Sequence, residues 1–478
     1  MFTKNKIIAS FFLFLILFSV LQFTVPHIIG FDGYFNIKAA DLIKKEGLIK
    51  EFPWAGHTIL AKSYSDTQFL FRIFLIPFTF FDLEFGAKIA SILFAAICFT
   101  VFYFFLLKND IKYAFFWALL YLFSSANLMY RFMETRQLPL AIALIILTIH
   151  FLQNRKYLFL GIISFAFVWL YSGFIIQLFI VLVYIIIERI FSRKFDYKII
   201  LYSFLGALLG LVINPYFPGN IPFLYAQVFK VNLLSNLYNV EWKPWTFIEF
   251  VKNNILILFY LIASLFILIK NKKIDRNKAF YLFLALFFLI YTIKTRRMHE
   301  YLIPFAILSL AFFFKDYSGN IDVKYLDLMK KAALASLIII ISVNFILARE
   351  EIANNTFLYD YEKCAEWMMH NVSKNSLVFN NAYTFTYLFF KNSDLRYTHG
   401  LDLTYSYLYD AEEFERYIGI LQGTLKSDAD YIIEDYNPDY LISGKLKQDV
   451  QLFNYIVKNR KNYKAVYEDE WCAVLEVK

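Results

Sequence analysis

Two carboxylates are the first side chains in this chain whose types and neighbours could support chemistry. Asp32 follows the first apolar run and precedes Gly33, and Glu134 lies between Arg131 and Arg136. A carboxylate at the edge of an apolar run is partly desolvated, which raises its proton affinity and suits a general base. We therefore expect a catalytic role for Asp32. The alternative is that Asp32 caps the N-terminus of a helix that follows it.

Glu134 has two interpretations, and the sequence leaves both open. Together with Asp32 it would form a paired-carboxylate site that activates an acceptor or binds a divalent metal, Mg²⁺ or Mn²⁺. Alternatively, its carboxylate forms an ion pair with Arg131 or Arg136. Asp32 and Glu134 are thus the candidate catalytic pair and the candidate metal ligands. The catalytic role requires no cofactor.

A group of basic and aromatic side chains lies at the start of a later apolar run. Its members are Lys294, Arg296, Arg297, His299 and Tyr301. Guanidinium groups match phosphate oxygens in a bidentate geometry. We expect these residues to bind a phosphate, which at a membrane surface belongs to a lipid-linked molecule. The alternative is that they anchor the segment among lipid headgroups.

The composition indicates the class of protein that holds these residues. The chain has 478 residues, of which 59% are hydrophobic, 21% aromatic and 18% charged, whereas a soluble domain carries about 25% charged residues. Apolar runs such as Ile7–Leu21 and Ala332–Leu347 recur through the first 349 residues. The composition excludes a disordered, collagenous or disulfide-scaffold protein. It indicates an α-helical, multispanning membrane protein.

The apolar runs and the positive charges between them predict a topology. We expect eleven transmembrane helices, near residues 7–28, 87–107, 113–130, 137–153, 157–171, 174–190, 199–216, 253–270, 279–293, 300–314 and 332–348. The first is interpreted as a retained helix rather than a cleaved signal. A cytoplasmic N-terminus places 19 Lys and Arg residues in cytoplasmic segments, in line with the positive-inside rule. Two short outer loops, at 131–136 and 294–299, oppose the rule with five Lys and Arg residues. The odd helix count then puts the C-terminal part outside the cytoplasm, at the plasma membrane.

The charge distribution divides the chain into two domains. Residues 1–349 carry a formal charge of +17 and are predicted to form the membrane domain, with a long first outer loop at 31–86. Residues 350–478 carry −8 and are predicted to form a soluble extracytoplasmic α/β domain. Because the basic excess lies in the membrane loops, the sequence does not indicate nucleic-acid binding.

Several segments have recognisable local patterns. Residues 31–47 have the spacing of an amphipathic helix that ends at Gly47, and the apolar segment 68–81 is expected to lie along the membrane interface. In the soluble domain, residues 376–380 and 440–443 resemble strands, and 360–370, 411–423 and 448–458 resemble helices.

The three cysteines suggest one pairing. Cys98 lies in an apolar run and is expected to be a packing residue, whereas Cys364 and Cys472 could pair if their domain faces an oxidising compartment.

The order of these motifs resembles the GT-C superfamily of membrane glycosyltransferases that use polyprenyl-phosphate sugars. The resemblance is to the protein O-mannosyltransferases and aminoarabinose transferases and, more distantly, to the oligosaccharyltransferase catalytic subunits. It rests on three segments of residues 1–315 and on a polar break between helices five and six. These are Phe-Asp-Gly-Tyr-Phe-Asn-Ile-Lys around Asp32, Arg-Phe-Met-Glu-Thr-Arg-Gln-Leu-Pro-Leu around Glu134, Lys-Thr-Arg-Arg-Met-His-Glu-Tyr-Leu-Ile-Pro from Lys294, and Trp169-Leu-Tyr-Ser-Gly173. The soluble part has no WWD-type signature of the oligosaccharyltransferases.

The resemblance implies an inverting hexosyl- or pentosyltransferase. Its partners would be a polyprenyl-phosphate sugar, membrane lipid, and a glycan, lipid or protein acceptor. Asp32 would take a proton from the acceptor, while Arg296, Arg297 and Lys294 would stabilise the charge on the leaving phosphate. A metal at Asp32 and Glu134 is compatible with this mechanism but not required by it.

Two other functions also fit a multispanning protein with outer cations. A transporter or flippase of lipid-linked sugars would need charged or broken helices near the bilayer midplane and two related halves. The sequence has few charges within its apolar runs and no half-to-half repeat. A polysaccharide polymerase or ligase is the other alternative. The position of the long loop, directly after the first helix, favours the transferase.

Overall fold

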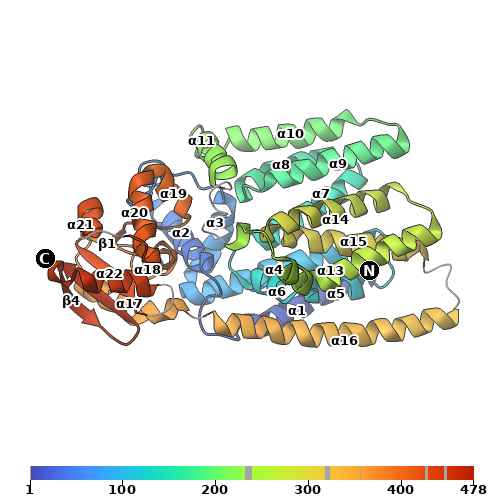
Figure 1. Ribbon diagram of the computed structural model, residues 1–478. Coiled ribbons are helices and arrows are strands. Elements are labelled where there is room, and N and C mark those ends of the chain that lie inside the picture. Colours follow the sequence, from blue (N-terminus) through green and yellow to red (C-terminus); the bar gives the residue numbers. More distant parts are fainter. Residues whose placement is uncertain (1, 232–239, 318–322, 356, 426–428, 446–448) are drawn as a thin grey trace.

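A computed structural model describes residues 2–231, 240–317, 323–355, 357–425, 429–445 and 449–478. A bundle of long apolar helices lies at one end of the molecule, and a small α/β part lies at the other (Figure 1). Helices from loop 31–86 lie between the two. The expected class, a helical bundle followed by an α/β part, is therefore confirmed.

The bundle is built from long apolar helices and several shorter ones. They are α1 (Phe2–Gln22), α4 (Leu83–Lys108), α5 (Ala114–Phe123), α6 (Ala126–Met133), α7 (Leu138–Gln153), α8 (Tyr157–Leu170), α9 (Phe174–Ser192), α10 (Tyr197–Val212), α13 (Phe247–Asn271), α14 (Arg276–Lys294), α15 (His299–Tyr317) and α16 (Val323–Asn354). Ten of the eleven expected spans each coincide with one of these helices, mostly within a few residues at each end, and the span expected at 113–130 covers both α5 and α6.

The described residues contain seven helices that are long and apolar enough to cross a membrane, or eight if α6 and α7 are one broken span. The chain is thus a multispanning membrane protein. The expected count of eleven is larger because α5, α8 and α10 are shorter apolar helices of 10–17 residues. At 1.5 Å per residue they reach roughly 15–25 Å, less than the ~30 Å hydrocarbon core.

The expected helix at 113–130 is wrong in one respect, because it is divided into α5 and α6. Ser125, between them, has an extended backbone, and its hydroxyl accepts a hydrogen bond from the Leu128 amide at 3.3 Å. A serine that caps a new helix competes with continuation of the old one. The first span also ends early, at Gln22 rather than near residue 28, since Pro26 disfavours helical backbone in the residue before it.

Loop 31–86 forms a structured layer. The predicted amphipathic helix is α2 (Asp32–Glu46), and it ends at Gly47, whose φ of 83° suits a residue without a Cβ. The apolar segment that follows forms α3 (Phe69–Leu75) and a 3₁₀ turn at Ile76–Phe80. Together they are too short to cross a bilayer, as expected for this segment.

The C-terminal part contains a five-stranded sheet in the order β2-β1-β3-β5-β4. The strands are β1 (Leu377–Phe379), β2 (Arg396–Tyr397), β3 (Tyr440–Gly444), β4 (Tyr463–Glu468) and β5 (Cys472–Val477). β1 pairs in parallel with β2 and β3, whereas β5 pairs antiparallel with β3 and β4. The predicted strands near 376–380 and 440–443 are β1 and β3; the hairpin β4–β5 was not predicted.

Short helices connect and cover these strands. They are α17 (Glu362–Asn371), α18 (Phe385–Lys391), α19 (Leu403–Tyr409), α20 (Ala411–Gln422), α21 (Tyr431–Tyr436) and α22 (Val450–Lys458). The three predicted helices correspond to α17, α20 and α22. The bounds of α20 follow from local chemistry: the Asp410 carboxylate accepts hydrogen bonds from the amides of Glu412 and Glu413, and Gly423 with φ 68° ends the helix.

Loop 31–86 and the sheet are joined by main-chain hydrogen bonds. Ala55 forms a parallel bridge with Tyr397 of β2, and the Gly56 amide donates to the Tyr397 carbonyl at 2.8 Å. The aromatic ring of Phe35 on α2 packs against Phe389 of α18, with 5.9 Å between centroids. The C-terminal part is therefore packed on the loop that follows the first helix.

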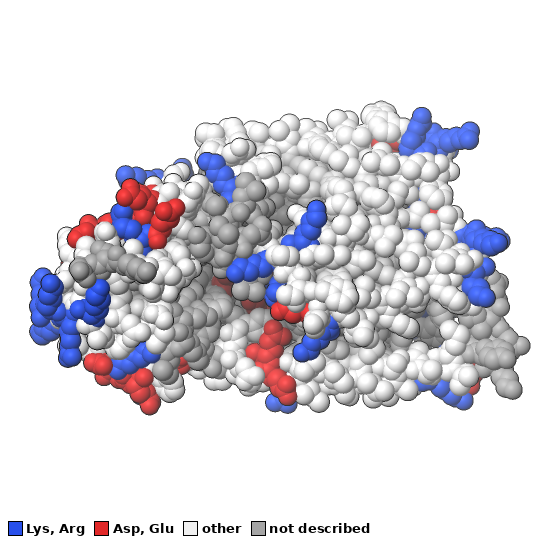
Figure 2. Space-filling model, viewed as in Figure 1, with Lys and Arg blue, Asp and Glu red and all other residues white. Residues whose placement is uncertain are grey.

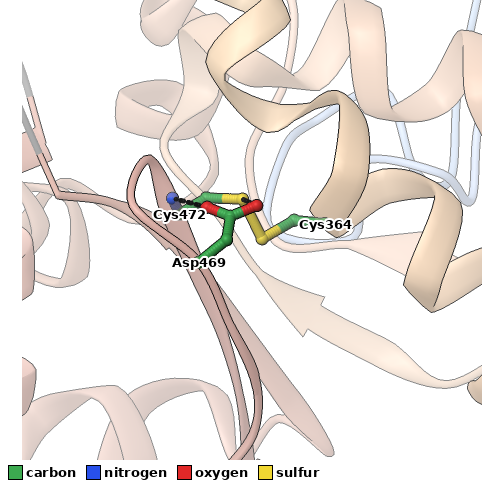
Figure 3. A group of neighbouring side chains, drawn as sticks. All are labelled: Cys364, Asp469 and Cys472. Carbon is green, nitrogen blue, oxygen red and sulfur yellow. Dashed lines mark hydrogen bonds between the residues drawn. A yellow bond between two sulfur atoms is a disulfide. The ribbon is translucent and has the colours of Figure 1, made fainter.

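A disulfide between Cys364 and Cys472 ties α17 to β5, so the pairing that the sequence left open is present (Figure 3). Asp469 lies beside it and accepts hydrogen bonds from the amides of Trp471 and Cys472 at 2.7 and 2.9 Å, which shapes the turn of the β4–β5 hairpin. Cys98 is buried in α4, as expected for a packing residue.

Candidate active site

The candidate site lies at the end of the bundle that faces the C-terminal part. A bend of 106° separates α6 from α7, and residues 134–137 form the break. Pro139, in the first turn of α7, suits a helix start because the amide that proline lacks would have no partner there. The break brings Glu134 and Arg136 beside the start of α2.

Seven charged side chains meet there, and we call them the ion cluster. They are Asp32, Arg131, Glu134, Arg136, Glu241, Arg297 and Glu300, and each forms at least one contact of 4.0 Å or less with a partner of opposite charge in the cluster. The helices α2, α6 and α15, the break after α6 and a 3₁₀ turn at Val240–Trp242 contribute most of them, and Arg297 comes from the 3₁₀ turn Arg296–Met298 before α15. Residues far apart in the sequence thus form one site.

Asp32 is the most accessible carboxylate of the cluster. It is the first residue of α2, its side chain is 46% exposed, and its Oδ2 lies 3.0 Å from Arg136 Nη2. Phe31 is the N-cap residue of α2, and no side chain forms a capping hydrogen bond. The alternative role of Asp32 as an N-cap is therefore wrong, and its carboxylate is available to a ligand.

Glu134, in contrast, is buried and paired. Its Oε2 lies 3.1 Å from Arg131 Nη1 and 3.1 Å from Arg136 Nη1, so the ion-pair interpretation is confirmed with both arginines. Gly30 makes room for it: with φ 78°, this residue packs so closely that an added Cβ would lie 2.5 Å from Glu134 Oε1. Glu134 therefore holds the two arginines in place beside Asp32.

Glu241 is one of two members of the cluster, with Glu300, that sequence reasoning missed. Its carboxylate faces three guanidinium groups, with Oε1 2.5 Å from Arg131 Nη1 and 3.3 Å from Arg136 Nη1, and Oε2 3.9 Å from Arg297 Nη1. Burial alone would raise the pKa of this carboxyl, but the three guanidinium groups hold it well below its usual range. Glu241 is therefore ionised at neutral pH.

Arg297 links the cluster to the break between α8 and α9. Its Nη2 donates a hydrogen bond to the Tyr171 hydroxyl at 3.0 Å, and its guanidinium lies over the Trp242 ring at 5.0 Å. Tyr171 belongs to the segment Trp169–Gly173, where the sequence predicted a polar break.

The other residues of the predicted phosphate site do not join the cluster. Arg296 pairs with Glu249 at 2.8 Å and lies over the Trp245 ring. Lys294 is exposed at the end of α14. His299 and Tyr301 are buried in α15, where Tyr301 stacks on Phe288. Among the five predicted residues, Arg297 is the one that forms an ion pair with another member of the cluster within the described residues.

The donor set of Asp32 and Glu134 fits a guanidinium better than a divalent metal. The Arg136 guanidinium already contacts both carboxylates. Within the described residues, the one group of three His, Cys, Asp or Glu side chains with ligand atoms within 4.8 Å is Cys364, Asp469 and Cys472. Both sulfur atoms of that group are used in the disulfide, so they are not thiolate ligands.

The missed residues had a weak signal in the sequence. Glu241 lies in Val-Glu-Trp-Lys-Pro-Trp, where two tryptophans flank charged residues, and Glu300 directly follows the basic segment. Neither position shows which arginine it faces, because the contacts with Arg131 join residues more than a hundred positions apart. No protein-family model matches this chain, and no curated protein matches it. A functional assignment therefore depends on the geometry of the ion cluster.

Proposed function

We propose that this protein is an integral-membrane glycosyltransferase that moves one sugar from a polyprenyl-phosphate donor to an acceptor at the outer membrane face. The observation that carries the proposal is the pairing of an accessible carboxylate, Asp32, with a group of guanidiniums at the end of an apolar bundle. A base and an anion site side by side are what transfer from a phosphate leaving group needs.

In the proposed reaction, Asp32 accepts a proton from the acceptor nucleophile. The nucleophile attacks the anomeric carbon, the bond from this carbon to the phosphate oxygen breaks, and the polyprenyl phosphate leaves with inversion. Arg136, Arg131 and Arg297 stabilise the charge that develops on the leaving phosphate, each contact contributing roughly 2–4 kcal/mol in a preorganised site. The burial of Glu134 against two arginines supports this preorganisation.

The proposal includes a topology of eleven spans with the C-terminal part outside the cytoplasm. Lys and Arg side chains gather at the end of the bundle remote from the sheet, where Arg193 and Lys272 are the C-cap residues of α9 and α13 (Figure 2). Positive charge favours the cytoplasmic side. The Cys364–Cys472 disulfide supports an oxidising compartment for the opposite end, and the plasma membrane is the proposed location.

A transporter of lipid-linked sugars and a polysaccharide polymerase or ligase are the competing functions. A transporter binds its cargo near the bilayer midplane, on broken helices. The α6–α7 break is the observation that favours it, but this break lies at the end of the bundle, beside loop 31–86. That position suits transfer at the surface better than passage through the membrane.

Mass spectrometry of glycans from cells with and without the gene tests the function. We expect one monosaccharide to be missing from a surface glycan, glycolipid or glycoprotein in the deletion strain and to return with the parent gene. The Asp32→Asn gene should not restore it. An unchanged glycan profile in cells that make the protein would contradict the transferase and the polymerase together.

A further inference from the structure

The Glu241 carboxylate lies where a phosphate would bind. Its two oxygens contact guanidinium nitrogens of Arg131, Arg136 and Arg297. Among these contacts the Arg131 interaction is bidentate, with Oε1 and Oε2 2.5 and 3.3 Å from the two terminal nitrogens. Arginine groups bind carboxylates and phosphates through the same planar fork. Glu241 therefore fills an anion site rather than merely neutralising a surface charge.

Glu241 also differs from the other carboxylates that these arginines contact. Glu134 and Glu300 belong to the α6–α7 break and to α15, and each side chain is only 7% exposed. Glu241 comes from the short 3₁₀ turn Val240–Trp242, and its side chain is 34% exposed. Asp32 is more exposed, at 46%, but contacts Arg136 alone within the described cluster. Glu241 is thus the accessible carboxylate that faces all three arginines, and a side-chain rotation can move it away from them without disturbing a helix of the bundle.

We infer that the Glu241 carboxylate occupies the phosphate subsite while no donor is bound, and that the anionic headgroup of the donor displaces this carboxylate on binding. This inference rests on the function proposed above and deepens it. The subsite consists of Arg131, Arg136 and Arg297, and its ligand is a lipid-linked phosphodiester. Trp242, which lies against Arg297, holds the 3₁₀ turn at the edge of the subsite when the carboxylate swings out.

The exchange conserves charge. A polyprenyl-phosphate sugar is a phosphodiester with one negative charge, the same as the carboxylate that it replaces. Arg131 and Arg136 also face Asp32, Glu134 and Glu300, whereas Glu241 is the cluster carboxylate within 4.0 Å of Arg297. Replacement of Glu241 by another monoanion therefore keeps the net charge of the cluster and leaves Arg297 with a facing anion. The donor must compete with this carboxylate for the same nitrogens.

Binding of a polyprenyl monophosphate to the purified chain in detergent tests the inference. Glu241→Gln removes the competing charge but keeps the side-chain length, so we expect roughly tenfold to hundredfold tighter binding, the value of a lost charge-assisted hydrogen bond. Glu249→Gln is the matched control. Glu249 pairs with Arg296 outside the ion cluster. The Glu249→Gln variant should therefore bind the lipid with the same affinity as the parent protein.

A second measurement uses the parent protein and does not depend on how a variant folds. A carboxyl-directed reagent modifies exposed glutamates, and mass spectrometry reports the modification of the peptide that contains Glu241. We expect polyprenyl monophosphate to increase modification of Glu241 several-fold and to leave Glu249 unchanged. Protection of Glu241 by the lipid would overturn the inference, because the carboxylate would then stay inside the occupied site.

The outcomes separate the inference from the proposed function. If the parent binds the lipid and Glu241→Gln binds it equally or more weakly, the inferred displacement of Glu241 is wrong, but the proposed transferase function stands. If neither protein binds the lipid, the inference and the proposed function both fail. If tight binding by Glu241→Gln is lost when Arg297→Gln is added, the three-arginine subsite is supported.

Discussion

At the scale of single residues, the two candidate carboxylates have different environments and therefore different roles. Glu134 is buried between Arg131 and Arg136, whereas Asp32 is about half exposed and contacts Arg136 alone within the described cluster. A base must reach its substrate, so Asp32 is the candidate for proton transfer. Glu134 is a positioning residue, which acts by orienting the two arginines.

Replacing Asp32 by Asn tests the first role. The substitution keeps the size of the side chain and removes the base, so turnover in the glycosyl-transfer assay should fall roughly 10²–10⁴-fold. Asp394→Asn is a matched control, because Asp394 is an exposed partner of Lys374 in the C-terminal part. Purified Asp32→Asn protein with near-parent turnover would make this carboxylate a surface ion-pair partner only.

The two neighbouring arginines should differ in their effects. Arg297 contacts Tyr171 and Glu241, so Arg297→Gln should cost about 1.5–3 kcal/mol in donor binding or transition-state stabilisation. Arg296 pairs with a half-exposed glutamate, and Arg296→Gln should cost less than about 1 kcal/mol. Arg297→Lys should recover part of this loss of binding or turnover, because lysine restores the positive charge but not the bidentate geometry of the guanidinium.

Donor-lipid binding and turnover of both variants in detergent provide the comparison. Equal losses for the two arginines would contradict the assignment of Arg297, rather than Arg296, to the subsite.

The sequence was sufficient to find part of this site. Asp32, Glu134 and Arg297 were predicted from their types and their positions at the ends of apolar runs, and all three lie in the ion cluster. Glu241 was not predicted, because a glutamate in a connecting segment has no local pattern that reveals its distant partners. His299 and Tyr301 were also predicted to bind the phosphate, and the side chains of both are buried in α15.

At the scale of elements, a buried histidine makes the C-terminal part sensitive to acid. His399 follows β2, packs against Tyr417 with 3.8 Å between the ring centroids, and has its Nδ1 3.0 Å from the Ser406 hydroxyl. Burial, and to a lesser degree the neighbouring His57, lowers the pKa of His399 well below its ordinary value. The folded protein therefore keeps this imidazole neutral.

The unfolded chain binds a proton at this histidine near pH 6.5, whereas the folded chain does not. Stability that is present above about pH 6.5 should thus be lost as the pH falls, by up to about 1.4 kcal/mol per pH unit. The thermal midpoint of the purified chain should be flat from pH 7 to 8 and should fall toward pH 5. His399→Gln should weaken this dependence. His370→Gln, at an exposed position, should retain it.

The disulfide between α17 and β5 should stabilise the same part. It joins residues separated by 108 positions, and closing a loop of this length restricts the unfolded chain. The double variant Cys364→Ser, Cys472→Ala should lose about 2–4 kcal/mol of stability, measured as a lower thermal midpoint. Cys98→Ala is the control for removal of a thiol. Maleimide labelling of both cysteines in unreduced, denatured protein would contradict the bond.

Element positions were predictable where one local signal dominates. Gly47 ends α2 and Gly423 ends α20 as expected, because a positive φ favours glycine. The division of the helix expected at 113–130 was missed, because a serine within an apolar run does not by itself indicate that a new helix begins there. β4 was missed because a bulge between Ala465 and Tyr467 interrupts its alternation. β5 was missed because its first four residues are all buried, so it shows no alternation of buried and exposed residues.

At the scale of the whole molecule, the ion cluster lies where three layers meet. The bundle supplies the arginines, loop 31–86 supplies Asp32, and the C-terminal part is packed on that loop through β2 and α18. Relative movement of the C-terminal part would therefore be transmitted to α2 and to Asp32. The helix α16 runs along the bundle, and its C-terminal end lies at the end of the bundle that faces the C-terminal part (Figure 1).

The topology is the prediction on which the whole arrangement depends. A phosphatase fused after Lys478 should be active and a fluorescent protein there should be dark, because the C-terminal part is proposed to lie outside. The matched control is the same pair of fusions in the connection between α13 and α14, after Lys273, at the end of the bundle where Lys and Arg gather (Figure 2). There, fluorescence should be present and phosphatase activity absent.

The opposite result at both positions would place Asp32 and the arginines at the cytoplasmic face, where a nucleotide sugar rather than an outer lipid-linked donor would be the available substrate. The same signal at both positions would mean that an even number of spans separates the two sites, so that α14, α15 and α16 do not all cross the membrane.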